Sequence, residues 1–126
     1  KAHVTIAVDV FDYLESAVKD KQQWDMVILD PPSFAPSEST LPRALNAYTK
    51  LIALGSKTTR SQGVLAASSC SSHVTEEAFI KLCEEGVSQA RRRATLIGKY
   101  SLPADHPTPL VMPELRYLKF LLLQLD

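Results

Sequence analysis

The chain has 126 residues, of which 45% are hydrophobic and 22% are charged, and this composition is typical of a folded domain with a core. Lysine plus arginine equals aspartate plus glutamate at 14 each, so the formal net charge is zero. Overall charge therefore gives no support to nucleic-acid binding, and a basic surface would have to be local, as at the arginine run 91–93.

The two cysteines, Cys70 and Cys83, are too few for a disulfide framework and lack the spacing of metal ligands, so we predict no metal site. No apolar run approaches the roughly 20 residues that cross a bilayer. The amino-terminal residues also lack the basic-then-apolar pattern of a secretory signal. We therefore expect a protein of the reducing cytoplasm without a membrane partner.

The first expected element is a strand over residues 3–8, which are apolar and β-branched and end at Asp9. The chain is already in this strand at its first residues and has no initiator methionine, so we expect a fragment of a larger protein. Apolar residues then recur at helical spacing and predict a short helix over residues 11–20. A polar connector at residues 19–23 leads to a second strand over residues 25–30.

The second strand ends in Asp30-Pro31-Pro32-Ser33-Phe34. The two prolines stop the strand, because neither can donate a hydrogen bond to a sheet ladder. The turn therefore holds an acid and an aromatic ring at the carboxyl end of the strand, where open α/β sheets bind their ligands. A loop over residues 36–42 and a helix over residues 43–59 follow, and Gly55 weakens the last turn of that helix by ~1 kcal/mol relative to alanine.

The third expected strand covers residues 64–70, and its small side chains predict helices packed on both of its faces. Thr75 can cap the next helix, whose first turn is acidic and whose end carries the arginine run, which we expect to be solvated. The last two strands follow one another without a helix. They are expected at residues 94–102 and 117–125, on either side of a proline-rich loop at residues 103–113. This order predicts an α/β fold with a parallel sheet whose last strand is antiparallel.

Three strand ends carry polar groups, at Asp9, Asp30 and Cys70, and in a parallel sheet all three lie at one edge. A thiol beside a carboxylate and a rigid turn predicts a nucleophilic site. Each residue also has a structural interpretation: Cys70 as a small core residue, Asp9 as a helix cap and Asp30 as the residue that holds the turn. His73 either caps a helix or lines the site, and we interpret Cys83 as a core residue.

These segments together resemble a known family. Asp-Val-Phe at 9–11, Asp-Pro-Pro-Ser-Phe at 30–34 and Ser-Ser-Cys-Ser-Ser-His at 68–73 have the order seen in class I S-adenosylmethionine-dependent methyltransferases. Ala-Asp-His-Pro at 104–107 and Tyr-Leu-Lys-Phe at 117–120 extend the likeness over nearly the whole chain. The most similar branch methylates carbon 5 of cytosine in large-subunit ribosomal RNA. Asp-Pro-Pro is shared with many amino-group methyltransferases, and Ser-Cys-Ser narrows the resemblance to carbon-5 chemistry.

The resemblance implies roles for individual residues. Cys70 would add to carbon 6 of a cytosine that has left its stack, and Asp30 would bind the ring nitrogen and the amine of that base. Asp9 would accept a hydrogen bond from the adenine amine of S-adenosylmethionine. The residues implied for the cofactor are Asp9, Val10, Phe11, Asp30 and Pro31. The residues implied for the RNA are Pro32, Phe34, Ser69, His73, Asp105 and His106, although His106 can also satisfy a loop turn.

The resemblance further implies that residues 1–126 are the carboxyl-terminal part of a Rossmann-like catalytic domain. In the family's sheet order, 3-2-1-4-5-7-6, the segment ending at Asp9 is strand 3 and the one ending at Asp30 is strand 4. Strands 1 and 2, the Gly-rich cofactor loop and the amino-terminal PUA domain have no counterpart here. We therefore expect strands 3 to 7 only, with residues 3–9 either docked beside residues 25–30 or paired between two molecules of a homodimer.

We expect this piece to be catalytically silent by itself, while its parent protein is a methyltransferase that acts on RNA. Two alternatives stay open. The first is an amino-nitrogen methyltransferase that uses Asp30-Pro31-Pro32 without the thiol. The second is a non-catalytic domain that serves as a binding or dimerisation scaffold.

Overall fold

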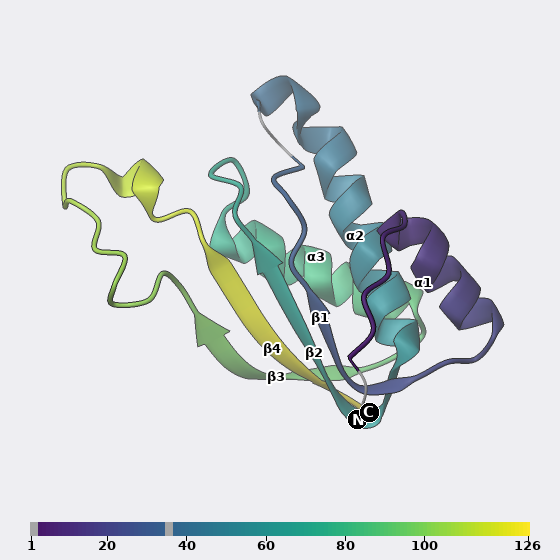
Figure 1. Ribbon diagram of the computed structural model, residues 1–126. Coiled ribbons are helices and arrows are strands. Elements are labelled where there is room, and N and C mark those ends of the chain that lie inside the picture. The colour runs from purple at the N-terminus through teal and green to yellow at the C-terminus, as the bar shows by residue number, and fades with distance from the viewer. Residues whose placement is uncertain (1–2, 35–36) are drawn as a thin grey trace.

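The computed structural model describes residues 3–34 and 37–126 and contains one mixed sheet with helices against it (Figure 1). The helices are α1 (Val10–Lys19), α2 (Leu41–Thr58) and α3 (Glu76–Gln89). The strands are β1 (Trp24–Leu29), β2 (Thr59–Ser69), β3 (Ala94–Tyr100) and β4 (Lys119–Leu125). Short 3₁₀ turns occupy Glu38–Thr40 and Pro113–Leu115. Pro36, the first residue of the loop expected at 36–42, lies outside the described residues, and α2 begins at Leu41, inside that expected loop.

The four strands are ordered β1-β2-β4-β3 across the sheet. β1 pairs in parallel with β2, whereas β4 is antiparallel to both β2 and β3. The prediction of an α/β sheet whose last strand is antiparallel is therefore confirmed. β3 and β4 follow one another without an α-helix between them, as expected, and the long loop that joins them projects away from the sheet (Figure 1).

Local sequence signals explain where the helices begin. Asp9 is the N-cap of α1, and its Oδ1 accepts hydrogen bonds from the backbone N–H of Phe11 (2.8 Å) and Asp12 (3.2 Å). Thr75 caps α3 by accepting from the N–H of Ala78 at 3.1 Å, as predicted. α2 begins with a proline in its first turn, where the missing N–H costs nothing.

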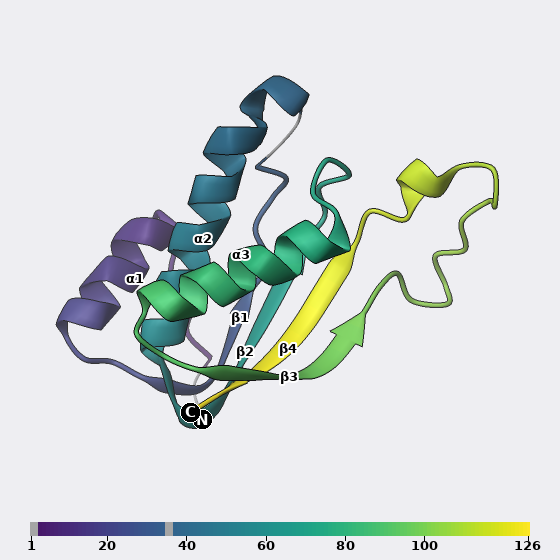
Figure 2. The same ribbon diagram turned by 180° about the vertical axis from the view of Figure 1, so that it is seen from behind.

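The helices cover one face of the sheet, which corrects the expectation of helices on both faces of the strand at 64–70. α2 and α3 lie in front of the strands in Figure 2, and α1 packs against α2 beside them. Large apolar side chains on the opposite face, among them Met26, Ile28 and Tyr100, are exposed. None of the helices in the described part of the chain is long and apolar enough to span a membrane.

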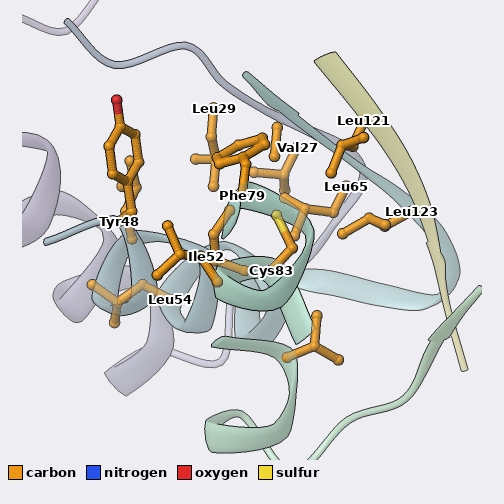
Figure 3. Packing of buried hydrophobic residues seen from close by; sticks show 14 of the residues in the cluster. Val27, Leu29, Tyr48, Ile52, Leu54, Leu65, Phe79, Cys83, Leu121 and Leu123 are labelled. Atoms are coloured by element: carbon orange, nitrogen blue, oxygen red, sulfur yellow. The ribbon is translucent and has the colours of Figure 1, made fainter. Parts of the chain in front are cut away.

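The core lies between the sheet and these helices (Figure 3). It is built from alternate residues of the strands and from the apolar stripes of α2 and α3. Its members include Val27, Leu29, Tyr48, Ile52, Leu54, Leu65, Phe79, Cys83, Leu121 and Leu123. β4 shows the alternation most clearly, because Lys119, Leu121, Leu123 and Leu125 are buried while the residues between them are half-buried.

The expected first strand does not form. Residues 3–9 have no place in the sheet, and the alternating side chains of Val4, Ile6 and Val8 are exposed, Val4 at 72%. The expectation that this segment docks beside β1 is therefore wrong. The reason is physical: β-branched residues favour an extended backbone, but a strand is stabilised by a ladder partner, and none of the described strands pairs with this segment. The other expectation, that residues 3–9 pair between two molecules of a homodimer, stays a prediction.

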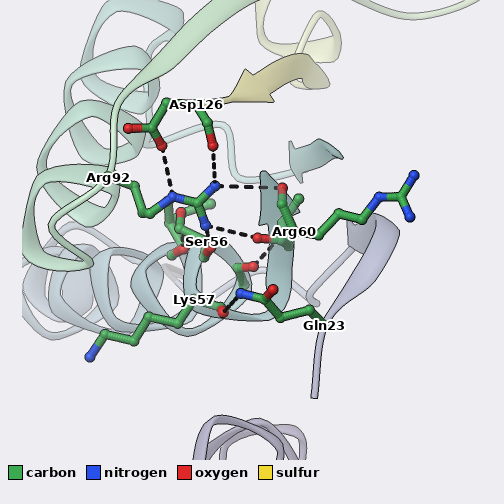
Figure 4. A network of polar contacts seen from close by, with 9 residues as sticks. Gln23, Ser56, Lys57, Arg60, Arg92 and Asp126 are labelled. Carbon is green, nitrogen blue, oxygen red and sulfur yellow. Dashed lines mark hydrogen bonds and ion pairs between the residues drawn. The ribbon is translucent and has the colours of Figure 1, made fainter. Parts of the chain in front are cut away.

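The arginine run also differs from expectation, because Arg92 is not a solvated helix end. Its guanidinium group donates to the backbone oxygens of Ser56 (3.0 Å) and Thr59 (2.8 Å) and to both Oδ1 (2.7 Å) and the backbone oxygen (2.8 Å) of Asp126 (Figure 4). This hydrogen bonding lowers the pKa of the Asp126 carboxyl group. Arg92 thus ties the end of α2 and the start of β2 to the end of β4.

The close approach of α2 and α3 generates a prediction. A Cβ at buried Gly86 would lie 2.7 Å from Cβ of Ile52 and 2.9 Å from the backbone oxygen of Thr49. Alanine has the better helix propensity by ~1 kcal/mol, but relieving a clash with backbone requires α2 to move, and overpacking of this kind costs ~1–3 kcal/mol. We therefore expect Gly86→Ala to lower the free energy of unfolding, measured by urea titration.

Ser88→Ala is the matched control, because Ser88 is exposed on the same helix. We expect it to leave stability unchanged or slightly higher, as propensity alone dictates. An increase in stability for Gly86→Ala equal to that control would contradict the close packing.

Candidate active site

The carboxyl ends of β1 and β2 form the centre of the candidate site. Because these strands are parallel and Leu29 lies opposite Ala67, Asp30 and Ser68 emerge side by side. The Ser68 hydroxyl donates to Oδ1 of Asp30 at 2.5 Å. Asp30 is exposed, and Cys70, two residues after Ser68, is half-buried. The predicted convergence of an acid and a thiol at one sheet edge is therefore present, whereas Asp9 lies outside the sheet.

A buried tyrosine of α2 contacts the carboxyl end of β2 from the face of the sheet that the helices cover. Tyr48 of α2 is only 1% exposed, and its hydroxyl oxygen accepts a hydrogen bond from Ser69 at 3.1 Å. Burial raises the pKa of Tyr48, so the phenol stays neutral. Ser69 itself is fully buried with its hydroxyl group bound to Tyr48, so in this structure it supports the site, and its expected contact with a substrate stays a prediction.

An aromatic row connects the centre of the site to the start of α1. The rings of Tyr48 and Phe34 lie 4.8 Å apart between centroids, and those of Phe34 and Phe11 lie 6.4 Å apart. The Lys50 ammonium lies 5.3 Å from the centroid of the Phe11 ring. The structure thus joins the residues expected for a substrate to those expected for a cofactor through contacts between rings.

The start of α1 offers a second set of groups. Oδ1 of Asp9 caps the helix, so the structural interpretation of this residue is correct. Within the described residues, its second oxygen, Oδ2, has no hydrogen bond, and Val10 beside it is exposed. A carboxylate oxygen without a hydrogen bond, beside an exposed aliphatic side chain and the ring of Phe11, fits a flat aromatic group that carries an amine.

The other residues expected in the site lie around the ends of β1 and β2 or on the projecting loop. Pro31 is half-buried and Pro32 exposed in the turn after β1, and His73 is exposed in the turn before α3. Asp105 and His106 lie on the projecting loop, where Nδ1 of His106 is 3.0 Å from Oδ1 of Asp105. This hydrogen bond lowers the pKa of Asp105. Among the described contacts, none joins this pair to Asp30 or Cys70.

The second cysteine provides a useful contrast. Cys83 is 3% exposed in α3, as its interpretation as a core residue requires, and burial raises its pKa to about 12. Its thiol is therefore inert at neutral pH.

The part of the chain that the structure describes contains no group of acids, histidines and cysteines that could hold a metal ion.

Three residues of the site were not singled out from the sequence: Ser68, Tyr48 and Lys119. Lys119 is 6% exposed, and its ammonium donates to the backbone oxygens of Ser71 and Tyr117. The sequence did contain a signal for Lys119. Lys119 stands at the same alternating positions as the buried apolar residues of β4, and a lysine is rarely buried without partners. Ser68 and Tyr48 carried no such signal, because their partners are distant in sequence.

Known proteins resemble this chain in sequence and in fold. The ribosomal RNA large subunit methyltransferase of Deinococcus radiodurans is 36% identical over 129 residues, which cover 98% of this chain and 30% of that protein. The ribosomal RNA large subunit methyltransferase I of Tolumonas auensis is 33% identical over 116 residues, which cover 92% of this chain and 29% of that protein. No protein-family model matches the chain.

A crystal structure described as a candidate methyltransferase in complex with S-adenosylhomocysteine has a TM-score of 0.76 and 28% identity, over 97% of this chain and 33% of that one. The chain therefore has a methyltransferase-like α/β fold. It spans about 30% of the curated relatives' length, and it aligns with their carboxyl-terminal part.

The bond between Ser69 and Tyr48 generates a prediction. Tyr48→Phe keeps the buried ring but removes the acceptor of the Ser69 hydroxyl proton, and Ser69→Ala removes that donor to the Tyr48 hydroxyl oxygen. We expect each variant to lose about 1 kcal/mol of unfolding free energy, and the double variant to lose less than the sum, since the two groups act as a pair. Urea titrations of all four proteins measure this coupling.

Tyr100→Phe serves as the control, because the Tyr100 side chain is 56% exposed and its hydroxyl group has no hydrogen bond among the described residues. It should leave stability unchanged. Strictly additive losses for Tyr48→Phe and Ser69→Ala would show that their hydrogen bond contributes nothing.

Proposed function

We infer that this chain is the carboxyl-terminal part of the catalytic domain of a class I, S-adenosylmethionine-dependent methyltransferase of the ribosomal RNA large-subunit family, to which its sequence and its fold both relate it. We propose that the parent protein methylates carbon 5 of a cytosine in ribosomal RNA. The observation that carries this proposal is the position of Cys70 and Asp30 at the ends of neighbouring parallel strands, with Ser68 holding the carboxylate.

The proposed cofactor site is the start of α1. Asp9 would accept from the adenine amine through Oδ2, and Val10 and Phe11 would contact the adenine ring. Asp30 and Pro31 complete the set at the edge of the sheet. When bound, S-adenosylmethionine supplies the methyl group and leaves as S-adenosylhomocysteine.

The proposed chemistry requires a thiolate, because carbon 5 of cytosine is a poor nucleophile by itself. The Cys70 thiolate would form a bond to carbon 6, which places electron density on carbon 5 for its methylation. The proton on carbon 5 would then pass to a base, the bond between sulfur and carbon 6 would break, and Cys70 would leave as a thiolate. The target base must be out of its stack to reach such a site.

Asp30 would recognise the base during this addition. A carboxyl group can bind the ring nitrogen and the exocyclic amine of cytosine, and it stabilises charge that develops on the ring. The Ser68 hydrogen bond limits the rotation of the Asp30 side chain, and Pro31 and Pro32 stiffen the backbone that follows. Phe34, packed on Tyr48, is proposed to shape the pocket, with His73, Asp105 and His106 as outer contacts to RNA.

The test of the covalent route uses the two cysteines. In the parent protein, we expect Cys70→Ala to lower the rate of ribosomal RNA methylation by on the order of 10³-fold or more, as loss of a nucleophile does. Cys83→Ala is the matched control, because Cys83 is buried away from the site and should change stability rather than chemistry. Methyl transfer from labelled cofactor to ribosomal RNA is the measurement.

Each alternative predicts a different result. Methylation that survives Cys70→Ala unchanged would favour an amino-nitrogen target and rule out the covalent route. A parent protein that neither methylates ribosomal RNA nor traps a 5-fluorocytosine RNA as a covalent adduct would favour a non-catalytic scaffold.

The proposed cofactor contacts of residues 1–126 also predict weak binding. The chain contributes Asp9, Val10, Phe11, Asp30 and Pro31 but no Gly-rich loop, so we expect no measurable binding of S-adenosylmethionine by residues 1–126 at micromolar concentrations. Isothermal titration calorimetry measures this, with the parent protein as the positive control. Micromolar affinity of residues 1–126 alone would show that the described residues suffice.

A further inference from the structure

Lys119 is a buried cation that the proposed chemistry does not use. It is the first residue of β4 and lies directly opposite Ser69 of β2 in the antiparallel ladder. Its side chain points to the covered face of the sheet with Leu121 and Leu123, and it is 6% exposed. Burial of an ammonium group is unfavourable unless its charge and its N–H groups have partners. The groups around Lys119 must therefore provide partners for its N–H groups and for its charge.

Two of these neighbours are backbone oxygens. The ammonium donates to the Ser71 oxygen at 2.5 Å and to the Tyr117 oxygen at 2.7 Å. Ser71 is the residue after Cys70, so Lys119 holds the turn that carries the thiol. Neither oxygen is charged, so these two bonds do not neutralise the ammonium.

A negative charge on the Cys70 sulfur would act on the Lys119 ammonium group. Burial lowers the pKa of Lys119, and a Cys70 thiolate opposes that change through its negative charge. Because the Lys119 ammonium is bonded to the backbone oxygen of the residue after Cys70, the thiol is carried by the same turn as a buried cation, where water screens charge poorly.

We propose that Lys119 is a positioning residue for the nucleophile: its ammonium group holds the Cys70 turn and presents a positive charge to reagents that approach the Cys70 sulfur. The consequence for catalysis depends on the proposed function, whereas the effect on the thiol does not. The need for such a cation follows from the other groups at the site. Asp30 is an acid at the same edge, so it repels an anionic reagent rather than attracts one, and Tyr48 is neutral.

A purely structural role for Lys119 makes a different prediction. If the ammonium held the two backbone oxygens but lay too far from the Cys70 sulfur to act on it, removal of its charge would not change which reagent Cys70 prefers. The charge of the reagent therefore separates the two roles. A thiolate displaces iodide both from neutral iodoacetamide and from anionic iodoacetate and gives a thioether in each case, but a nearby cation favours the anionic reagent.

The experiment uses the folded parent protein and follows alkylation of the Cys70 peptide by mass spectrometry. The variants are Lys119→Met, which removes the charge, and Lys119→Arg, which keeps it. Lys99→Met is the matched control, because Lys99 is exposed on β3 and its ammonium lies 2.7 Å from Glu76. Cys83 is the internal control for folding, because its burial protects it until the core opens.

We expect Lys119→Met to lower the iodoacetate-to-iodoacetamide rate ratio at pH 7 by about twofold or more. Lys119→Arg and Lys99→Met should keep the wild-type ratio. An unchanged ratio in a Lys119→Met protein whose Cys83 stays protected would overturn the proposal.

If Lys119→Met fails to fold, the wild-type protein still provides a test. Added salt should lower the iodoacetate-to-iodoacetamide ratio at Cys70 in the folded protein more than in the urea-unfolded protein, because screening weakens the attraction. An equal salt response in both states would overturn the proposal. A ratio that depends on Lys119 in a protein without methylation activity would contradict the proposed function and leave this inference intact.

Discussion

The parallel pairing of β1 with β2 is the constraint on which the candidate site depends. Its register places Leu29 opposite Ala67, so the chain leaves both strands at the same edge of the sheet. The two prolines prevent β1 from continuing, and Asp30 is left in reach of Ser68. A shift of one residue would turn the Ser68 side chain to the other face and remove that hydrogen bond. Packing of Val27, Leu29 and Leu65 against the helices opposes such a shift.

The covered face of the sheet contains polar groups as well as a hydrophobic core. Ser69, Tyr48 and Lys119 are buried directly beneath the turn that carries Cys70, and each has a hydrogen-bond partner. Such groups are expensive to bury without partners, and these hydrogen bonds offset that cost. At the opposite end of the strands, Arg92 joins α2, β2 and β4 through backbone oxygens. The sheet is thus held by polar contacts at both ends and by apolar packing between them.

Much of the architecture was predictable because its signals are local. Asp9 and Thr75 precede their helices as caps, and the Asp30-Pro31-Pro32 turn marks the end of β1. The positions of Asp30 and Cys70 at one edge followed from strand order and the rule for parallel sheets. The exceptions were residues 3–9, whose composition resembles that of a strand, and the arginine run, whose middle member is an interior contact. Both depend on partners that periodicity does not reveal.

The sequence by itself determined the order of the helices and strands after Asp9, and which polar residues stand at the ends of β1 and β2. These properties arise from caps, prolines and side-chain alternation within a few residues of each site. Only the tertiary structure decided which distant side chains meet: Ser68 with Asp30, Ser69 with Tyr48, and Lys119 with the turn at Cys70. It also decided that residues 3–9 stay outside the sheet. The reason is that strand register and ladder partners are long-range properties, set by the packing of whole elements.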